Sequence, residues 1–139
     1  MAKSLAFFNH KGGVGKTTLV VNTARAFCQL GLRTLVVDAD PQCNATAFYL
    51  DEPTVDQLLD ESVDPEEGGT IWSGIARYVR ARGDVRAVAA LDVGDQVSLL
   101  PGDVLLAGFE DRLSAAWKIR FHATRPLLTC YPPSTGRFS

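Results

Sequence analysis

The sequence lacks any apolar run long enough to span a membrane. Its first residues, Met1-Ala2-Lys3-Ser4, contain no signal-peptide segment and lead directly into a short apolar stretch. From these two absences we expect a cytoplasmic protein with no membrane association.

Cysteine is scarce. The three residues, Cys28, Cys43 and Cys130, are odd in number and show no C-x-x-C spacing, which argues against a thiolate metal site. We interpret them as free thiols in a reducing compartment. Cys28 lies on the apolar side of an expected helix and is predicted to be a core residue. No histidine base stands beside Cys43 in the sequence, so a catalytic thiol is not expected there.

The sequence has no excess of positive charge. Its net charge is −2, so it has no overall basic field to hold nucleic acid. The arginine-rich segment from residue 77 to residue 86 allows two interpretations, a nucleic-acid patch or a solvated helix face. Alternating charge favours the second. With 139 residues, 46% of them hydrophobic, the chain has the size of one modest domain.

The sequence also contains a glycine-rich octet. It runs from Lys11 to Thr18, follows the apolar run Leu5-Ala6-Phe7-Phe8, and precedes a stretch with helical periodicity from Thr17 to Leu30. This is the strand, loop and helix order of a nucleotide-binding P-loop, although His10 stands where the general motif has glycine. The predicted nucleotide-binding residues are Lys11, Gly12, Gly13, Val14, Gly15, Lys16, Thr17 and Thr18.

The residue types in this octet suit a triphosphate. Its glycines let backbone N–H groups point at phosphate oxygens with no Cβ in the way. Lys16 can reach the β- and γ-phosphates, and the hydroxyl of Thr17 can bind Mg²⁺. The positive end of the following helix adds to the attraction. The alternative is a glycine-rich turn with incidental lysines.

Two acids follow a second expected strand. Residues 33–37 are apolar and β-branched, as in a strand buried on both faces of a parallel sheet, and Asp38-Ala39-Asp40-Pro41-Gln42 comes next. Ligands of open α/β sheets bind at the carboxyl ends of the strands, so Asp38 and Asp40 are expected beside the phosphate loop. A helix N-cap and turn is the alternative, since Asp and Pro suit both.

The octet resembles the deviant Walker A box of the ParA/MinD family of ATPases, whose signature is an extra lysine before the paired glycines, and Asn9-His10 is also typical of that family. The resemblance implies that Lys11 reaches the nucleotide of a partner subunit in an ATP-sandwich homodimer. The Asp-x-Asp-Pro-Gln segment is similar to the family's second box. It implies that Asp38 lies near Mg²⁺ and that Asp40 orients the attacking water.

The resemblance therefore implies ATP and Mg²⁺ as cofactors and Lys11, Lys16 and Asp40 as catalytic residues. Slow turnover in this family times the dissociation of the dimer. A ParB-like partner protein and non-specific DNA are further implied partners. The C-terminal segment contains prolines where a MinD-like membrane helix would lie, so partitioning is the favoured branch.

The similarity extends to about Trp117, since Val97-Ser98-Leu99-Leu100 is a third strand candidate that continues into Pro101-Gly102-Asp103. We expect an α/β, Rossmann-like P-loop NTPase domain over residues 1–117, with a mostly parallel sheet and helices on both faces. It would be present as its N-terminal half only, without the Walker B strand and the adenine site. Such a half sheet predicts an open edge and marginal stability.

Residues 118–139 differ in composition from the rest of the chain. They contain three prolines, and they contain no Asp or Glu. One hypothesis is a frameshift or truncation after about Trp117. The other is a natural tail that binds an acidic partner or stays disordered. Two functions follow for the chain, a nucleotide-dependent dimerisation switch used in partitioning, or a non-catalytic nucleotide-binding or pairing module.

Overall fold

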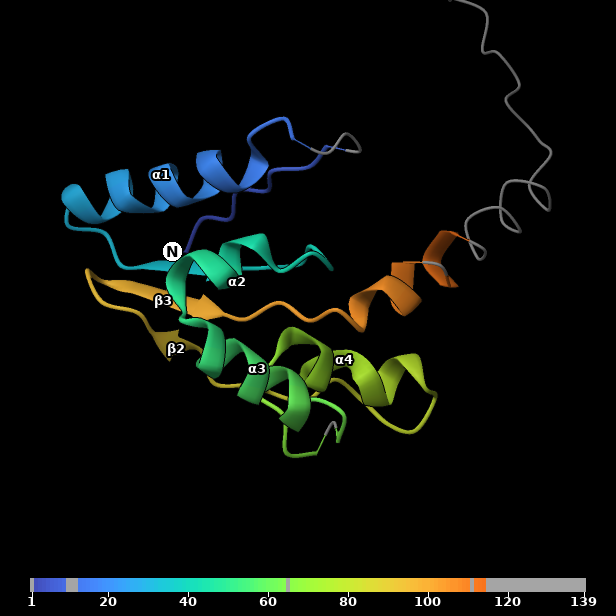
Figure 1. Ribbon diagram of the computed structural model, residues 1–139. Helices are drawn as coiled ribbons and strands as arrows, with labels where there is room; N and C mark the ends of the chain where they lie inside the picture. Colours follow the sequence, from blue (N-terminus) through green and yellow to red (C-terminus); the bar gives the residue numbers. More distant parts are fainter. Residues whose placement is uncertain (1, 10–12, 65, 111, 115–139) are drawn as a thin grey trace, which may run out of the picture.

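The computed structural model describes residues 2–9, 13–64, 66–110 and 112–114 (Figure 1). Its elements are α1 (Lys16–Gln29), β1 (Thr34–Val37), α2 (Asn44–Tyr49), α3 (Glu52–Glu61), α4 (Ile71–Val79), β2 (Leu91–Asp92) and β3 (Val97–Leu100). Residues 106–110 and 112–114 are also helical.

The three strands form one sheet in the order β1-β3-β2. β1 and β3 are parallel, in a register that pairs Thr34 with Val97 and Val37 with Leu100, while β2 runs antiparallel to β3. Parallel neighbours need a long crossover, and α2, α3 and α4 lie in it. This is the predicted α/β class. β2 was not predicted, because its two residues are too few for an alternating pattern.

The first core joins α1 to the sheet. Ala24 packs with Val36 of β1 and with Val97 and Leu99 of β3, and Val20 and Cys28 pack around this cluster. The periodicity that predicts a helix after the phosphate loop therefore marks the face that α1 buries. This packing fixes the start of α1 beside the carboxyl end of β1.

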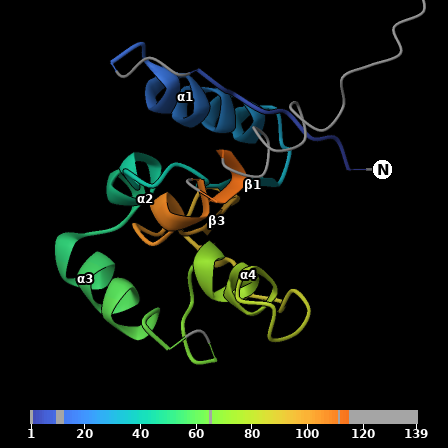
Figure 2. The same ribbon diagram turned by 90° about the vertical axis from the view of Figure 1, so that its right-hand side faces the viewer.

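A second core lies around α4. Trp72 and Ala76 pack with Leu106, and Ile75 and Phe109 border them. The two views show α1 and α4 on opposite sides of the strands, with α2 between them and α3 next to α4 (Figures 1 and 2). The segment after β3 is therefore held by α4 and not by α1.

The strand predicted at Leu5-Ala6-Phe7-Phe8 is wrong for this structure. Residues 2–9 have no regular secondary structure, and Leu5 and Phe8 are exposed. A strand needs a neighbour with which to exchange backbone hydrogen bonds, and no described strand pairs with this segment. Apolar composition alone is therefore not enough to make this segment a strand.

The prediction that residues 33–37 are buried on both faces is also wrong. Val36 is 4% exposed, but Leu35 and Val37 on the other face of β1 are 56% and 47% exposed. Only the face beneath α1 is covered among the described residues, because no described helix packs on Leu35 and Val37. Among the described strands β1 lies at the edge of the sheet, in agreement with the predicted open edge.

The helix predicted from Thr17 to Leu30 agrees with α1, which runs from Lys16 to Gln29. Gly31 follows α1 with φ of +77°, the left-handed conformation expected of a helix C-cap glycine. The third predicted strand coincides with β3. Residues 115–139, which include Trp117 and the acid-free segment, lie outside the described residues. None of the described helices is long and apolar enough to cross a membrane.

Candidate phosphate-binding site

The glycines before α1 form an open turn. Gly13 and Gly15 have φ of +71° and +83°, a region that side chains rarely adopt. A Cβ placed on either residue would meet no atom within 4 Å. The backbone is therefore exposed to whatever occupies the space in front of it, as a phosphate cradle requires.

The first turn of α1 has no internal cap. Its N-cap, Gly15, offers no side-chain hydrogen bond, and no acidic residue occurs in the turn. The helix's first backbone hydrogen bond runs from Leu19 N to the Gly15 carbonyl, so the N–H groups before Leu19 have no acceptor within the helix. By contrast, Asp51 caps α3 and Thr70 caps α4. The positive end of α1 is thus suited to an external anion.

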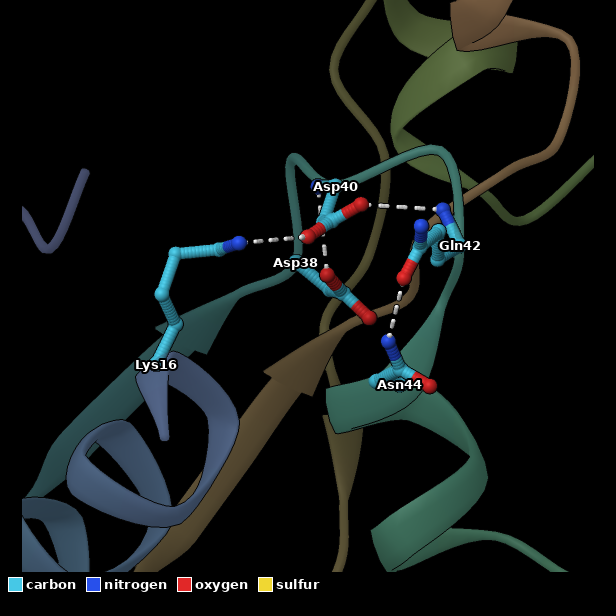
Figure 3. Close-up of polar contacts among 5 residues, drawn as sticks. All are labelled: Lys16, Asp38, Asp40, Gln42 and Asn44. Carbon is cyan, nitrogen blue, oxygen red and sulfur yellow. Dashed lines mark hydrogen bonds and ion pairs between the residues drawn. The ribbon is translucent and has the colours of Figure 1, made fainter. Parts of the chain in front are cut away.

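Lys16 and Asp40 face each other across this turn (Figure 3). Lys16 Nζ lies 3.7 Å from Asp40 Oδ2, and the two side chains are 28% and 32% exposed. An ion pair this exposed is worth only ~0–1 kcal/mol. Lys16 can therefore turn from Asp40 to a phosphate at little cost.

The acid loop after β1 is folded by its own side chains. The backbone N–H of Gln42 donates to Asp40 Oδ1 at 3.0 Å, and the Asn44 side chain donates to Gln42 Oε1 (Figure 3). Asp38 differs from Asp40 in being 4% exposed. Its Oδ2 accepts two hydrogen bonds from Thr46, and its Oδ1 accepts the Asp40 N–H at 3.3 Å.

A pocket of about 280 Å³ joins these parts. This volume is just below the ~300–1,000 Å³ of sites that enclose whole ligands, so it suits the phosphate end of a nucleotide. The lining residues are Gly13, Val14, Gly15, Lys16, Thr17, Thr18, Asp40, Gln42 and Asn44. Two of the predicted site residues, Lys11 and Gly12, lie outside the described residues.

Asp38 does not line the pocket. Among the described residues, no three His, Cys, Asp or Glu side chains group as a metal site. Mg²⁺ is commonly held by one or two protein oxygens together with substrate phosphates, so Thr17 and Asp40 beside a phosphate cradle fit that chemistry.

Four residues near the site were not assigned a role from the sequence. Gln42 and Asn44 line the pocket, and Thr46 and Gly102 lie behind it. Gln42, Asn44 and Thr46 belong to the segment that follows Asp40, so proximity in sequence was an available signal. Gly102 had no such signal, because β3 brings it to the acid loop from far along the chain.

Cys43 is buried beside the acids but is not suited to nucleophilic chemistry. Burial, together with the nearby carboxylates of Asp38, Asp103 and Asp40, raises the pKa of its thiol from 9.0 to about 12. The thiol therefore stays protonated at neutral pH. This agrees with the expectation that Cys43 is not catalytic.

A second hollow, of about 420 Å³, lies next to α4 and is lined by Val63, Asp64, Glu66, Arg77, Arg80 and Arg82. Arg77 pairs with Glu66 at 3.4 Å, and Arg80 lies over the Trp72 ring at 5.6 Å. Arg77 and Arg80 are therefore engaged within the chain, on a surface of mixed charge. The interpretation as a solvated helix face remains the simpler one.

The fold and the open glycine turn are those of an α/β domain of the P-loop NTPase class. The sequence matches the family described as AAA domain (AAA_31) over residues 2–127, and the chain belongs to this family. The resemblance to ParA-type ATPases is confirmed by the relatives described next.

The relatives include partitioning proteins. The chain is 45% identical over 60 residues to the sporulation initiation inhibitor protein Soj of Bacillus subtilis, an alignment that covers 42% of this chain and 24% of Soj. It is 53% identical over 45 residues to the chromosome-partitioning ATPase Soj of Thermus thermophilus, covering 32% and 18% of the two chains. The alignments thus span less than a quarter of these relatives.

Solved structures extend the likeness. The crystal structure of protein DIP2308 from Corynebacterium diphtheriae superposes with a TM-score of 0.67 at 34% identity, covering 84% of this chain and 41% of that one. Cobyrinic acid a,c-diamide synthase from Mycobacterium smegmatis, with bound ADP and magnesium, gives a TM-score of 0.50 at 29% identity. That match covers 77% of this chain and 37% of the synthase.

Proposed function

We propose that this chain binds Mg²⁺-ATP at the start of α1 and acts as a ParA-like ATPase, a nucleotide-dependent dimerisation switch in plasmid or chromosome partitioning or related positioning. The uncapped first turn of α1 behind the open glycines is the observation that carries this proposal. Side chains of Asp51 and Thr70 cap α3 and α4, and Asp38 accepts the Thr46 N–H in the first turn of α2, which has no N-cap side chain of its own. A triphosphate is the ligand that such a turn, with Lys16 beside it, would favour.

In this proposal, different residues of the chain bind the phosphates, hold Mg²⁺ and orient the water. Backbone N–H groups of the turn would hold phosphate oxygens, and Lys16 would leave Asp40 to meet the β- and γ-phosphates. Thr17 would hold Mg²⁺, which when bound neutralises charge on the transferred phosphoryl group. Asp40, freed from Lys16, would orient the attacking water. A synthase of similar fold that carries ADP and magnesium supports this choice of cofactors.

The dimer is the finer part of the proposal. Lys11 would act across the interface on the partner's nucleotide, as the family resemblance implies. A ParB-like protein and non-specific DNA are the partners that a partitioning role would add. Relatives named for chromosome partitioning support this branch.

Nucleotide binding without turnover is the second candidate. Asp40 is the single carboxylate among the described residues that line the pocket, and it is paired with Lys16. A site with one engaged acid would bind phosphates more readily than it would activate water. The chain would then serve as a nucleotide-binding or pairing module.

Calorimetry with Mg²⁺-ATP on the 139-residue chain tests the binding step. We expect saturable binding that Lys16→Ala abolishes, because the substitution removes the cation beside the helix start. Lys3→Ala is the matched control, since Lys3 is exposed and lies outside the pocket. No binding by the folded wild type, or equal binding by the Lys16→Ala variant, would refute the site.

Phosphate release separates the two candidates. Turnover that Asp40→Ala abolishes, while Asp56→Ala on the exposed face of α3 leaves it intact, would establish the ATPase. Tight binding without phosphate release would establish the module. Light scattering with a non-hydrolysable analogue, in wild type and Lys11→Ala, would test the nucleotide-dependent dimer.

A further inference from the structure

Behind the pocket, one hydroxyl joins the acid loop to the end of β3. Thr46 is 2% exposed, and its Oγ1 donates to Asp38 Oδ2 at 2.8 Å while accepting the Gly102 N–H at 2.7 Å. The Thr46 backbone N–H donates to the same Asp38 oxygen at 2.8 Å. The single hydroxyl therefore satisfies two buried groups that come from different elements.

Asp38 transmits this anchoring to Asp40. With Oδ2 held by Thr46, the other oxygen of Asp38 accepts the backbone N–H of Asp40. Asp38 N also donates to the Leu100 carbonyl at 3.1 Å, which continues the pairing of β1 with β3. The backbone of Asp40 is thus tied to the sheet through a carboxylate that is itself fixed on both sides.

The carboxylate of Asp40 is the group that needs such support. It is a third exposed and lies on a loop, and its side chain meets Lys16 and the Gln42 N–H. Groups on loops hold their geometry only when a surrounding shell fixes them. The buried contacts of Thr46 and Asp38 are the part of that shell that the described residues provide.

We propose that Thr46 is a positioning residue, whose hydroxyl fixes Asp38 and, through Asp38, holds Asp40 facing Lys16 and the phosphate pocket. This inference rests on the proposed function for its effect on turnover. It also assigns Asp38 a positioning role and not a direct contact with the Mg²⁺ near which the family resemblance places it, because its carboxylate is buried and already accepts three hydrogen bonds.

Thr46→Val and Thr46→Ser in the full chain test the proposal. Valine keeps the volume but lacks the hydroxyl, whereas serine retains it. Amide hydrogen exchange at Asp40 should become roughly tenfold faster in Thr46→Val, as expected for loss of about one net hydrogen bond, and should return toward wild type in Thr46→Ser. Thr54→Val, whose side chain makes no described hydrogen bond, is the matched control.

Turnover supplies the second readout. We expect kcat for ATP to fall by about 10- to 100-fold in Thr46→Val, with the nucleotide Kd unchanged and kcat recovered in Thr46→Ser. Unchanged exchange at Asp40 in Thr46→Val would overturn the positioning role whether or not the chain hydrolyses ATP. Faster exchange at Asp40 in Thr46→Val, together with a wild type that releases no phosphate, would instead refute the ATPase and leave the anchoring intact.

Asp38→Asn covers the case in which Thr46→Val does not fold. Its amide oxygen can still accept from Thr46, but its NH₂ would face the Asp40 N–H, so only the link to Asp40 is lost. We expect faster exchange at Asp40 and an unchanged half-saturating Mg²⁺ concentration for nucleotide binding. Unchanged exchange at Asp40, or a large rise in the Mg²⁺ requirement that would identify Asp38 as a direct ligand, would overturn the proposal.

Discussion

At the scale of single residues, Gly102 is the position with the least room for change near the site. A Cβ there would lie 3.0 Å from Asp38 Cγ and 3.2 Å from Cys43 Sγ, and both neighbours are buried. Neither atom can move without disturbing the loop that carries Asp40. The requirement for glycine here comes from close approach and not from backbone angle.

Gly102→Ala should lower the free energy of unfolding by about 1–3 kcal/mol, the usual cost of overpacking a core. Urea unfolding followed by circular dichroism measures it. Gly108→Ala is the control, because a Cβ there meets nothing within 4 Å. Equal stability of the two variants would show that the loop yields to the added methyl group.

Cys43 makes stability depend on alkaline pH. Its thiol has a pKa of about 12 in the folded chain, raised by burial and neighbouring carboxylates from 9.0. Between these values the unfolded chain has lost this proton and the folded chain has kept it, so raising the pH favours unfolding. Below pH 9 both states hold the proton and the effect disappears.

We therefore expect the stability of wild type relative to Cys43→Ala to be constant up to about pH 9 and to fall above it. Denaturant titrations of both proteins from pH 8 to pH 10.5 give the difference. A difference that stays the same over this range would contradict the raised pKa.

Sequence reasoning at this scale found the residues whose chemistry is visible in their type and order. Lys16, Thr17 and Asp40 line one pocket, as the glycine-rich octet and the acid pair predict. The roles of Thr46 and Gly102 were not predicted from the sequence. Both depend on packing, since the Thr46 hydroxyl bridges two distant segments and Gly102 has no room for a Cβ. Asp38 was predicted to lie beside the phosphate loop, but its burial could not be derived from the sequence.

At the scale of elements, α3 shows how a helix without fully buried residues is kept in place. None of its residues is classed as buried, and Asp51 caps it by accepting the Thr54 N–H at 3.3 Å. Glu52 in the first turn adds a favourable interaction with the helix dipole. Local interactions therefore carry much of the stability of this helix.

Asp51→Ala should cost about 1 kcal/mol, the typical value for loss of an N-cap. Asp56→Ala, on the exposed face of the same helix, should change stability by less than ~0.5 kcal/mol. Thermal unfolding of the two variants against wild type makes the comparison. Equal losses in both would mean that helix charge, and not the cap, is responsible.

The elements also show where a pattern stops being sufficient. Residues 34–37 and residues 5–8 are both short and largely apolar, but only the first form a strand, because β3 pairs with them. Helices were easier to predict, since their hydrogen bonds are internal and their periodicity marks the buried face. Strand pairing depends on a partner far away in the sequence.

At the scale of the whole molecule, the edge strand β1 has one face covered by α1 and one exposed face among the described residues. Leu35 and Val37 project from the edge strand on the uncovered side and are about half exposed. Exposed apolar side chains next to an unpaired strand edge favour association between chains. The expected weakness of a half sheet therefore has a definite location.

Replacing both Leu35 and Val37 with lysine should reduce concentration-dependent association. It should change the free energy of unfolding less than a substitution in the core, because about half of each side chain is already exposed. Sedimentation velocity over a range of concentrations measures the association. Leu99→Lys is the contrast, because Leu99 is 0% exposed and a charge there should unfold the chain. Undiminished association in the double variant would place the contact on another surface.

The pairing of β1 with β3 also sets the order in which the molecule can be completed during synthesis. Thr34 meets Val97, and the hydroxyl behind the acid loop meets the Gly102 N–H, so both contacts close a long loop of chain. Contacts between distant residues form slowly compared with a helix such as α1. A nascent chain that has already made its glycine turn must therefore wait for the end of β3 to leave the ribosome before Asp40 is held in place.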